Sequence, residues 1–190
     1  VAGMHQAEAG FFDDLEIHGF ATQGYIKTSE NNFFGDSESG SFDFRELGIN
    51  ASTEPLPNMR LAGQLLSRKA GEISDGDVEV DFALADVTLR SDEKGSVGVM
   101  VGRIKNPLGL FNETRDVAFT RPGIFVPQVV YYDKVRDLFL SADGIGLRAD
   151  AFGRAANANF YFGVGKPQVD ENAEHGFLGA AFSGDLESKG

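Results

Sequence analysis

The chain has 190 residues, of which 42% are hydrophobic, so it is long enough to bury a core and too apolar to be disordered. Its formal net charge of −12 argues against nucleic-acid binding, because a phosphate-binding surface needs an excess of Lys and Arg. The chain has no cysteine, which excludes disulfides, thiol catalysis and zinc–thiolate sites.

The N-terminal segment has the pattern of a processed export signal. Ala7-Glu8-Ala9 matches the small-x-small pattern of a signal-peptidase site, although no charged region or long apolar run precedes it. We expect residues 1–11 to be the remainder of a signal peptide and residues 12–190 to be the folded part.

Alternating apolar and polar residues, separated by clusters of Gly, Asp, Asn and Ser, predict β-strands along the chain. In chain order the predicted strands are 15–28, 41–53, 59–70, 78–90, 96–105, 138–153, 157–166 and 176–185. No stretch has a convincing helical periodicity. The fold class predicted is all-β, an antiparallel meander of about eight long strands.

Each predicted strand has an apolar face and a polar face. Between residues 59 and 70, the apolar face carries Met59, Leu61, Gly63 and Leu65, opposite Arg60, Gln64 and Arg68. Between residues 78 and 90, we expect Val78, Val80, Phe82 and Leu84 opposite Glu79 and Asp81. The two later strands place Ile145, Leu147, Ala149, Ala151, Ala158, Phe160, Phe162 and Val164 on apolar faces.

Two architectures explain such strands. In a soluble β-sandwich the apolar face meets a core, and strands average about 5–6 residues. In a membrane β-barrel the apolar face meets lipid, the polar face lines an aqueous lumen, and strands of about 9–11 residues span the bilayer. Long strands, charged residues at their centres, and frequent Gly and Ala on the apolar faces favour the barrel. No apolar run reaches the length of about 18 residues that a transmembrane helix needs.

Four segments carry a resemblance to a known family. They are "IHGFATQGYIKTSENNFFGD", "SFDFRELGINAS", "VGRIKNPLGLFNETRD" and "FVPQVVYYDKVRDLFLSADGIGL". They resemble the first half of a Gram-negative outer-membrane porin-like family, which is distantly similar to the phosphate-selective porin O/P group. The similarity extends from about Leu15 to Gly153, and its most specific part is V-G-R-x-K-x-P-x-G-L followed by N-E-T-R-D.

The resemblance implies a barrel of about 16 strands in the outer membrane, reached by export through the periplasm. Residues 12–190 would then form the N-terminal half of a porin barrel. This expectation agrees with the ending "DLESKG", which lacks the terminal aromatic residue of the family. The implied partners are outer-membrane lipid and small hydrophilic solutes, with the homotrimer common among porins. The rival is a closed barrel of about eight strands, whose side chains would fill the interior.

A long loop is predicted at residues 106–137, inserted after the strand that ends in Lys105. Pro107 removes a ladder donor and Gly109 relaxes the backbone, so strand pairing stops there. Loops of this length are usually functional or disordered, and the aromatic content argues against disorder. We expect the loop to fold into the lumen and narrow the pore. The residues expected to pack it on the wall are Phe111, Phe119, Phe125, Tyr131 and Tyr132.

The cations of this region are candidate pore-lining residues. Arg103 and Lys105 share a face as residues i and i+2, and we expect that face to be the lumen, because a charge on the lipid face costs about 2–4 kcal/mol. Between residues 101 and 137, six cations outnumber four anions, whereas the rest of the chain is acidic. The six are Arg103, Lys105, Arg115, Arg121, Lys134 and Arg136. A basic constriction would attract small anions. Alternatively, Arg115/Asp116 and Arg136/Asp137 pair and hold the loop in place.

No catalytic, metal or cofactor site is predicted. The chain lacks the G-x-S-x-G, H-E-x-x-H, G-x-x-x-x-G-K-S/T and G-x-G-x-x-G motifs. The acidic turns "SDGD" and "GDSESGSFD" offer carboxylates to Ca²⁺, but solvated turns have the same composition. The expected function is non-enzymatic, passive diffusion of small hydrophilic solutes through a porin with a mild preference for anions. The alternative is a soluble β-sandwich module that binds carbohydrate or another small ligand through its aromatic loop.

Overall fold

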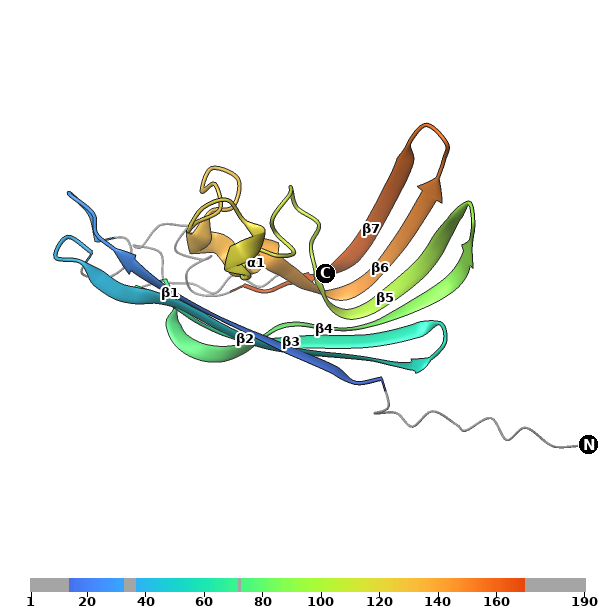
Figure 1. Cartoon of the computed structure of the whole chain (residues 1–190), viewed down its shortest axis with the longest axis horizontal. Coiled ribbons are helices and arrows are strands. Elements are labelled where there is room, and N and C mark those ends of the chain that lie inside the picture. Colours follow the sequence, from blue (N-terminus) through green and yellow to red (C-terminus); the bar gives the residue numbers. More distant parts are fainter. Residues whose placement is uncertain (1–13, 33–36, 72, 170–190) are drawn as a thin grey trace, which may run out of the picture.

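The computed structural model describes residues 14–32, 37–71 and 73–169. They form one antiparallel sheet in which each strand pairs with the next along the chain (Figure 1). The strands are β1 (Glu16–Ile26), β2 (Ser41–Leu56), β3 (Met59–Ala70), β4 (Asp75–Asp92), β5 (Gly95–Lys105), β6 (Ser141–Phe152) and β7 (Asn157–Pro167). The predicted all-β meander is confirmed over seven strands. The leader at 1–11 and the predicted strand at 176–185 lie outside the described residues.

The sheet is curved (Figure 1), and its two faces differ in polarity. Large apolar side chains on the convex face are exposed: Ile17, Leu47, Ile49, Leu65, Val78, Val80, Val101, Ile145, Leu147, Phe160, Phe162 and Val164. They lie in register across strands, as where Ile145 pairs with Val164 and Leu147 with Phe162. The concave face carries charged and polar side chains together with apolar ones such as Phe44 and Phe82. Its charged and polar residues include Glu46, Asn50, Gln64, Arg68, Asp86, Arg148 and Asp150. The alternation predicted for residues 59–70, 145–151 and 157–164 is therefore present.

Strand β4 departs from the predicted alternation. Gln64 pairs with Phe82 and Leu65 with Val80, so Asp81 is an extra residue in a β-bulge. A shift of one residue moves all later side chains to the other face. Val78 and Val80 therefore lie on the convex face, whereas Phe82 turns to the concave face, where Lys105 Nζ lies 5.6 Å from its ring centroid. The prediction of one face for Val78 to Leu84 is wrong, because it assumes an unbroken period of two.

The two-residue turns and the longest connection lie at opposite ends of the sheet (Figure 1). Residues 57–58, 93–94 and 153–156 join strands at one end, and residues 27–40, 71–74 and 106–140 at the other. The last of these contains η1 (Ala118–Thr120), η2 (Asp133–Val135) and α1 (Arg136–Leu140). No helix in the described part of the chain is both long enough and apolar enough to cross a membrane.

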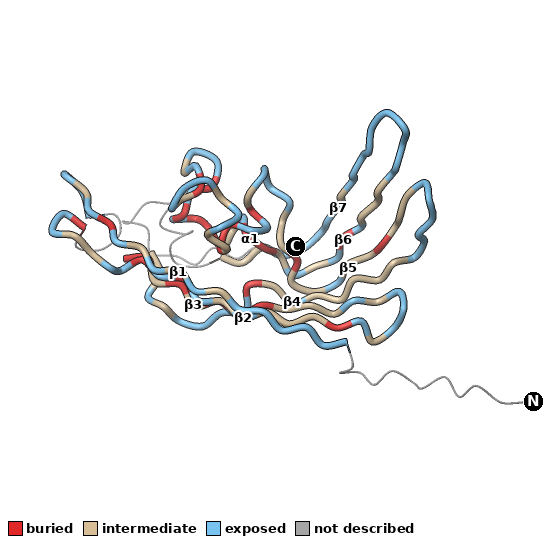
Figure 2. Tube along the Cα trace, in the orientation of Figure 1, coloured by how far each residue is buried: buried red, intermediate tan, exposed pale blue. Residues whose placement is uncertain are grey.

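The hydrophobic core of the described residues is small. Ile26, Phe44 and Ala70 are buried together, with Ile73 and Phe125 packed against them. The rings of Phe44 and Phe125 meet edge to face, with centroids 5.0 Å apart. Figure 2 shows buried residues gathered mainly where the loop meets the sheet, while the turns of the β4–β5 and β6–β7 hairpins are exposed. Much of the buried surface of the sheet is therefore buried by the loop.

Candidate functional site: the loop on the concave wall

Residues 106–140 lie over the concave face of the sheet (Figure 1). The base of the loop closes where the Asn106 backbone N–H donates to Leu140 O at 2.9 Å. The buried side chain of Asn112 reinforces this closure. Its Nδ2 lies 2.8 Å from Asn106 O, 3.0 Å from Phe139 O and 3.3 Å from Leu140 O. One amide therefore ties the beginning of the loop to its end.

Aromatic packing within the loop is centred on Tyr131. Its Oη accepts hydrogen bonds from the backbone N–H groups of Leu110 at 2.6 Å and Phe111 at 2.9 Å. Its ring meets the Phe111 ring edge to face at 6.1 Å, and the Arg115 guanidinium lies 5.8 Å from the ring centroid. With Phe125 on the core, three of the five aromatics expected to pack the loop lie in packed positions.

Phe119 and Tyr132 lie differently, because these residues are 86% and 45% exposed. Phe119 belongs to η1, a single turn that buries none of its residues. Tyr132 has an extended backbone between the buried Tyr131 and Asp133, so its side chain points to the opposite side. The expectation that these two rings pack on the wall is corrected by their exposure.

The Asp116 cluster (Asp81, Lys105, Asp116 and Arg136) joins the loop to strands β4 and β5. Lys105 Nζ lies 2.6 Å from Asp81 Oδ2 and 2.9 Å from Asp116 Oδ2. The Arg136 guanidinium lies 2.6 Å from Asp116 Oδ1 and 3.7 Å from Asp81 Oδ1. Gln64 Nε2 adds a hydrogen bond to Asp81 Oδ2 at 2.6 Å. Two cations thus share two carboxylates, one carboxylate from the wall and one from the loop.

The Asp133 cluster (Glu46, Arg68, Arg115, Arg121 and Asp133) joins the loop to strands β2 and β3. Asp133 accepts from Arg115 at 2.7 Å and from Arg68 at 3.0 Å. Glu46, the cross-strand partner of Arg68, is 3.3 Å from that residue and 2.8 Å from Arg121 of the loop. The chain of ion pairs therefore crosses between loop and wall twice, at Asp133–Arg68 and at Glu46–Arg121.

Burial makes these charges dependent on one another. Burial alone would raise the pKa of the Asp116 carboxyl, but Arg136 and Lys105 lower it well below its usual range. Burial likewise opposes the charge of Arg136, but Asp116 and Asp81 hold its pKa above the usual value. Burial and the neighbouring Arg136 lower the pKa of Arg115 to about 10. Breaking such a buried pair by removing one partner typically costs about 3–5 kcal/mol, because it leaves an uncompensated charge.

The six predicted pore-lining cations fall into three groups. Lys105, Arg115, Arg121 and Arg136 are held in the two clusters by ion pairs. Lys134 is exposed beside Asp133. Arg103 is partly exposed and pairs with Asp143 at 2.8 Å. Pairing is the alternative expectation for Arg115 and Arg136, and both are paired, although their closest carboxylates are Asp133 and Asp116. Arg115 pairs with Asp133, and the contact of Arg136 with Asp137 is long at 3.8 Å.

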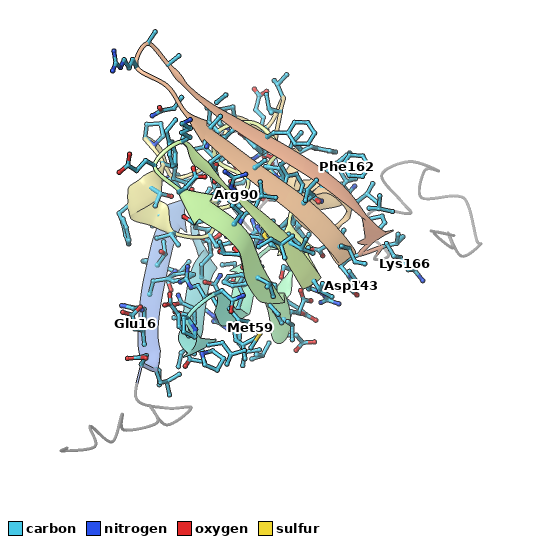
Figure 3. The ribbon with its side chains drawn as sticks, turned by 90° about the vertical axis from the view of Figure 1, so that its right-hand side faces the viewer. Glu16, Met59, Arg90, Asp143, Phe162 and Lys166 are labelled. Carbon is cyan, nitrogen blue, oxygen red and sulfur yellow. The ribbon has the colours of Figure 1, made fainter. Side chains whose placement is uncertain are left out.

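Arg103 and Lys105 reach different surroundings although they are two residues apart. β5 pairs with β6 without a register shift, so alternation places Arg103 on the side of Val99 and Val101. Its guanidinium extends into the gap between β4 and β5 and donates to Val80 O at 3.0 Å. Its partner Asp143 lies beside Lys166 of β7 (Figure 3). Lys105 ends the strand, and its side chain turns to the loop instead. The expectation that Arg103 and Lys105 share one face toward the lumen is therefore wrong.

Sequence reasoning missed the wall carboxylates and the loop closure. Glu46, Asp81, Asp133 and Asn112 are buried participants that were not singled out. A signal for one of them is present, because Asp81 is a charged residue on the polar side of a long predicted strand. Nothing in the local sequence indicates Asn112 or the pairing of Asp133 with Arg68, since the partners are distant along the chain.

The described residues contain no group of three or more His, Cys, Asp or Glu side chains placed to hold a metal ion. The clusters are instead alternating ion pairs whose charges satisfy each other. The role that these contacts support is therefore to hold the loop in place on the charged wall. Comparison of the chain with protein-family models, curated proteins and solved structures gives no match.

Proposed function

We propose that this chain forms part of an outer-membrane porin, through which small hydrophilic solutes diffuse passively. The observation that carries the proposal is the inverted polarity of the sheet. Large apolar residues of all seven described strands are exposed on the convex face, while buried charges occupy the concave face. A water-soluble protein seldom exposes so continuous an apolar surface, whereas a barrel wall needs one against lipid.

The connections support the same reading. Outer-membrane barrels have short turns on the periplasmic side and longer loops outside. The two-residue turns at 57–58 and 93–94 lie at one end of this sheet, and the connection 106–140 lies at the other. We infer that residues 57–58 and 93–94 face the periplasm and that 106–140 enters the lumen from the outer side.

The lumen of the proposed porin is narrowed by the loop 106–140. Packing on the concave wall and the two charge clusters hold the loop in one position. A fixed loop would give the pore a constant upper limit on the size of the solutes that pass. In these clusters, five cations face four carboxylates. The mild preference for anions is therefore proposed to come from this small excess of positive charge and from the exposed Lys134, rather than from unpaired cations.

The described sheet is open, since β1 and β7 each have one strand partner among the described residues. An open edge is not tolerated in the hydrocarbon region of a membrane. We propose that further strands close the barrel, to about 16 in total as in the family the sequence resembles.

The proposal is tested on the full-length protein expressed with an export signal. It should fractionate with the outer membrane, migrate faster on unheated gels than after boiling, and conduct in planar lipid bilayers. A protein that is soluble and monodisperse without detergent, and that gives no conductance, would reject the porin in favour of the soluble binding module.

A further inference from the structure

A cavity separates the loop from the part of the concave wall formed by β4 to β7. Its volume is about 680 Å³, within the range of about 300–1,000 Å³ typical of small-molecule sites. Phe82, Leu84 and Met100 contribute apolar side chains from the wall, and Pro107 and Glu113 border the cavity from the loop. The ion pairs of the Asp133 cluster lie elsewhere, so this cavity is separate from the contacts that hold most of the loop.

Tyr161 of β7 forms a flat platform in this cavity. A Cβ at Gly146 would lie 3.0 Å from the ring carbon Cε2, and one at Gly163 would lie 2.7 Å from the hydroxyl. The ring therefore rests against the backbone of β6 and β7, at positions where only glycine leaves room. One ring face is covered by the sheet and the other borders the cavity. Tyr161 Oη makes no hydrogen bond to another described residue.

A row of polar groups lies beside the ring. Arg148, the cross-strand partner of Tyr161, donates to Asp86 at 2.9 Å and to Thr88 Oγ1 at 2.8 Å. Asp150 accepts from Ser96 Oγ at 2.7 Å and from Asn159 Nδ2 at 2.6 Å. Each of these side chains is fixed by a neighbour on the wall, so the row is preorganised for a ligand.

The charged side chains that line the cavity have no net charge. Two cations, Lys105 and Arg148, stand against two anions, Glu113 and Asp150. Lys105 is engaged with Asp81 and Asp116, and Arg148 with Asp86. Neither cation is therefore free to bind an inorganic anion with its full charge. A charged solute would gain little here, whereas hydroxyl groups can exchange hydrogen bonds with carboxylate and amide groups.

From this combination we propose a binding subsite for a neutral, hydroxylated ring, that is, a sugar or a cyclic polyol. The less polar face of the ring stacks on Tyr161, and the hydroxyl groups at its edge meet Asp150, Asn159 and Tyr161 Oη. Phe82 and Met100 enclose the remaining apolar surface. This inference rests on the proposed porin function, and it identifies the class of solute that the pore would retain in transit.

The experiment compares the full-length protein with Tyr161→Ala, Gly146→Ala and the control Tyr132→Ala. Tyr132 is an exposed tyrosine of the loop that does not line the cavity. The probe is methyl α-glucopyranoside, and sorbitol is the acyclic comparison. Two quantities are measured, namely block of KCl conductance in planar bilayers and equilibrium binding in detergent micelles by calorimetry.

We expect the glucoside, but not sorbitol, to block and to bind, with affinity weakened about threefold to tenfold in Tyr161→Ala. Gly146→Ala should weaken binding similarly, because it displaces the ring while retaining the tyrosine. Tyr132→Ala should behave like the parent. Unchanged affinity in both site variants, equal block by sorbitol, or block by inorganic phosphate alone would overturn the subsite. Sugar binding without any conductance would support the subsite and reject the porin. Conductance without sugar binding would support the porin and reject the subsite.

Discussion

Asp81 of β4 and Lys105 of β5 form an ion pair of 2.6 Å beyond the point at which their strands stop pairing. The last backbone partners of the two strands are Ala83 and Arg103. The bulge at Asp81 turns this carboxylate toward the concave side, where Lys105 also meets Asp116 of the loop. The ion pair therefore closes the gap between two strands and fixes the loop that leaves from one of them.

Replacement of Asp81 should loosen the loop. Asp81→Ala removes the wall carboxylate from two buried cations, so we expect a loss of about 3–5 kcal/mol in the free energy of unfolding. Cleavage within residues 106–140 by an added protease should become faster. Asp143→Ala is the matched control, because Asp143 pairs with Arg103 at an exposed position, and such pairs contribute about 0–1 kcal/mol. Equal destabilisation by the two variants would contradict the assigned role of the Asp116 cluster.

Much of the sheet could be predicted from the sequence, because a period of two is a local property. The strands at residues 59–70 and 157–166 were expected with bounds and faces close to those observed. The face of Phe82 could not be predicted, because a bulge inserts one residue without changing the composition of the strand. The partners of Arg115 and Arg121 could not be predicted either. They lie on other elements, and the choice among several carboxylates depends on how the loop folds.

Lys134 should contribute to ion selectivity without contributing to stability. It is exposed on the loop, whereas Arg121 is buried against Glu46. Under the proposed function, Lys134→Glu should shift the reversal potential in a KCl gradient toward cation preference and leave the unfolding free energy within about 0.5 kcal/mol of the parent. Arg121→Gln should instead destabilise the protein, because it leaves Glu46 with one fewer cation. A reversal potential that changes with neither substitution would rule out a role for these charges in selectivity.

Because Asn112 closes the base of the loop, its replacement should have its effect at that base. Asn112→Ala removes the side-chain donor to Asn106 O and leaves Phe139 O with Asn106 Nδ2 as its one remaining side-chain donor, which we expect to cost about 1–3 kcal/mol. Hydrogen exchange of the Asn106 amide should become faster, because its bond to Leu140 O closes the same base. Asn58→Ala is the control, since Asn58 makes a long hydrogen bond of 3.4 Å in an exposed turn. Unchanged protection of Asn106 in Asn112→Ala would show that the loop base is held by other contacts.

Acid should release the loop through Asp116. Arg136 and Lys105 hold the pKa of this carboxyl below its value in the unfolded chain, which is about 3.9. A carboxyl with a lowered pKa stabilises the fold fully above its unfolded pKa, and the contribution is lost as the pH falls toward its folded pKa. The groups facing it are Lys105 and Arg136, with Asp81 across the cluster. We therefore expect protease cleavage within 106–140 to accelerate as the pH drops below about 4, measured with an acid-active protease. In Asp116→Asn, which cannot titrate, cleavage should be faster at neutral pH and change less with acid. An equally steep acid response in the variant would assign the transition to other carboxyls.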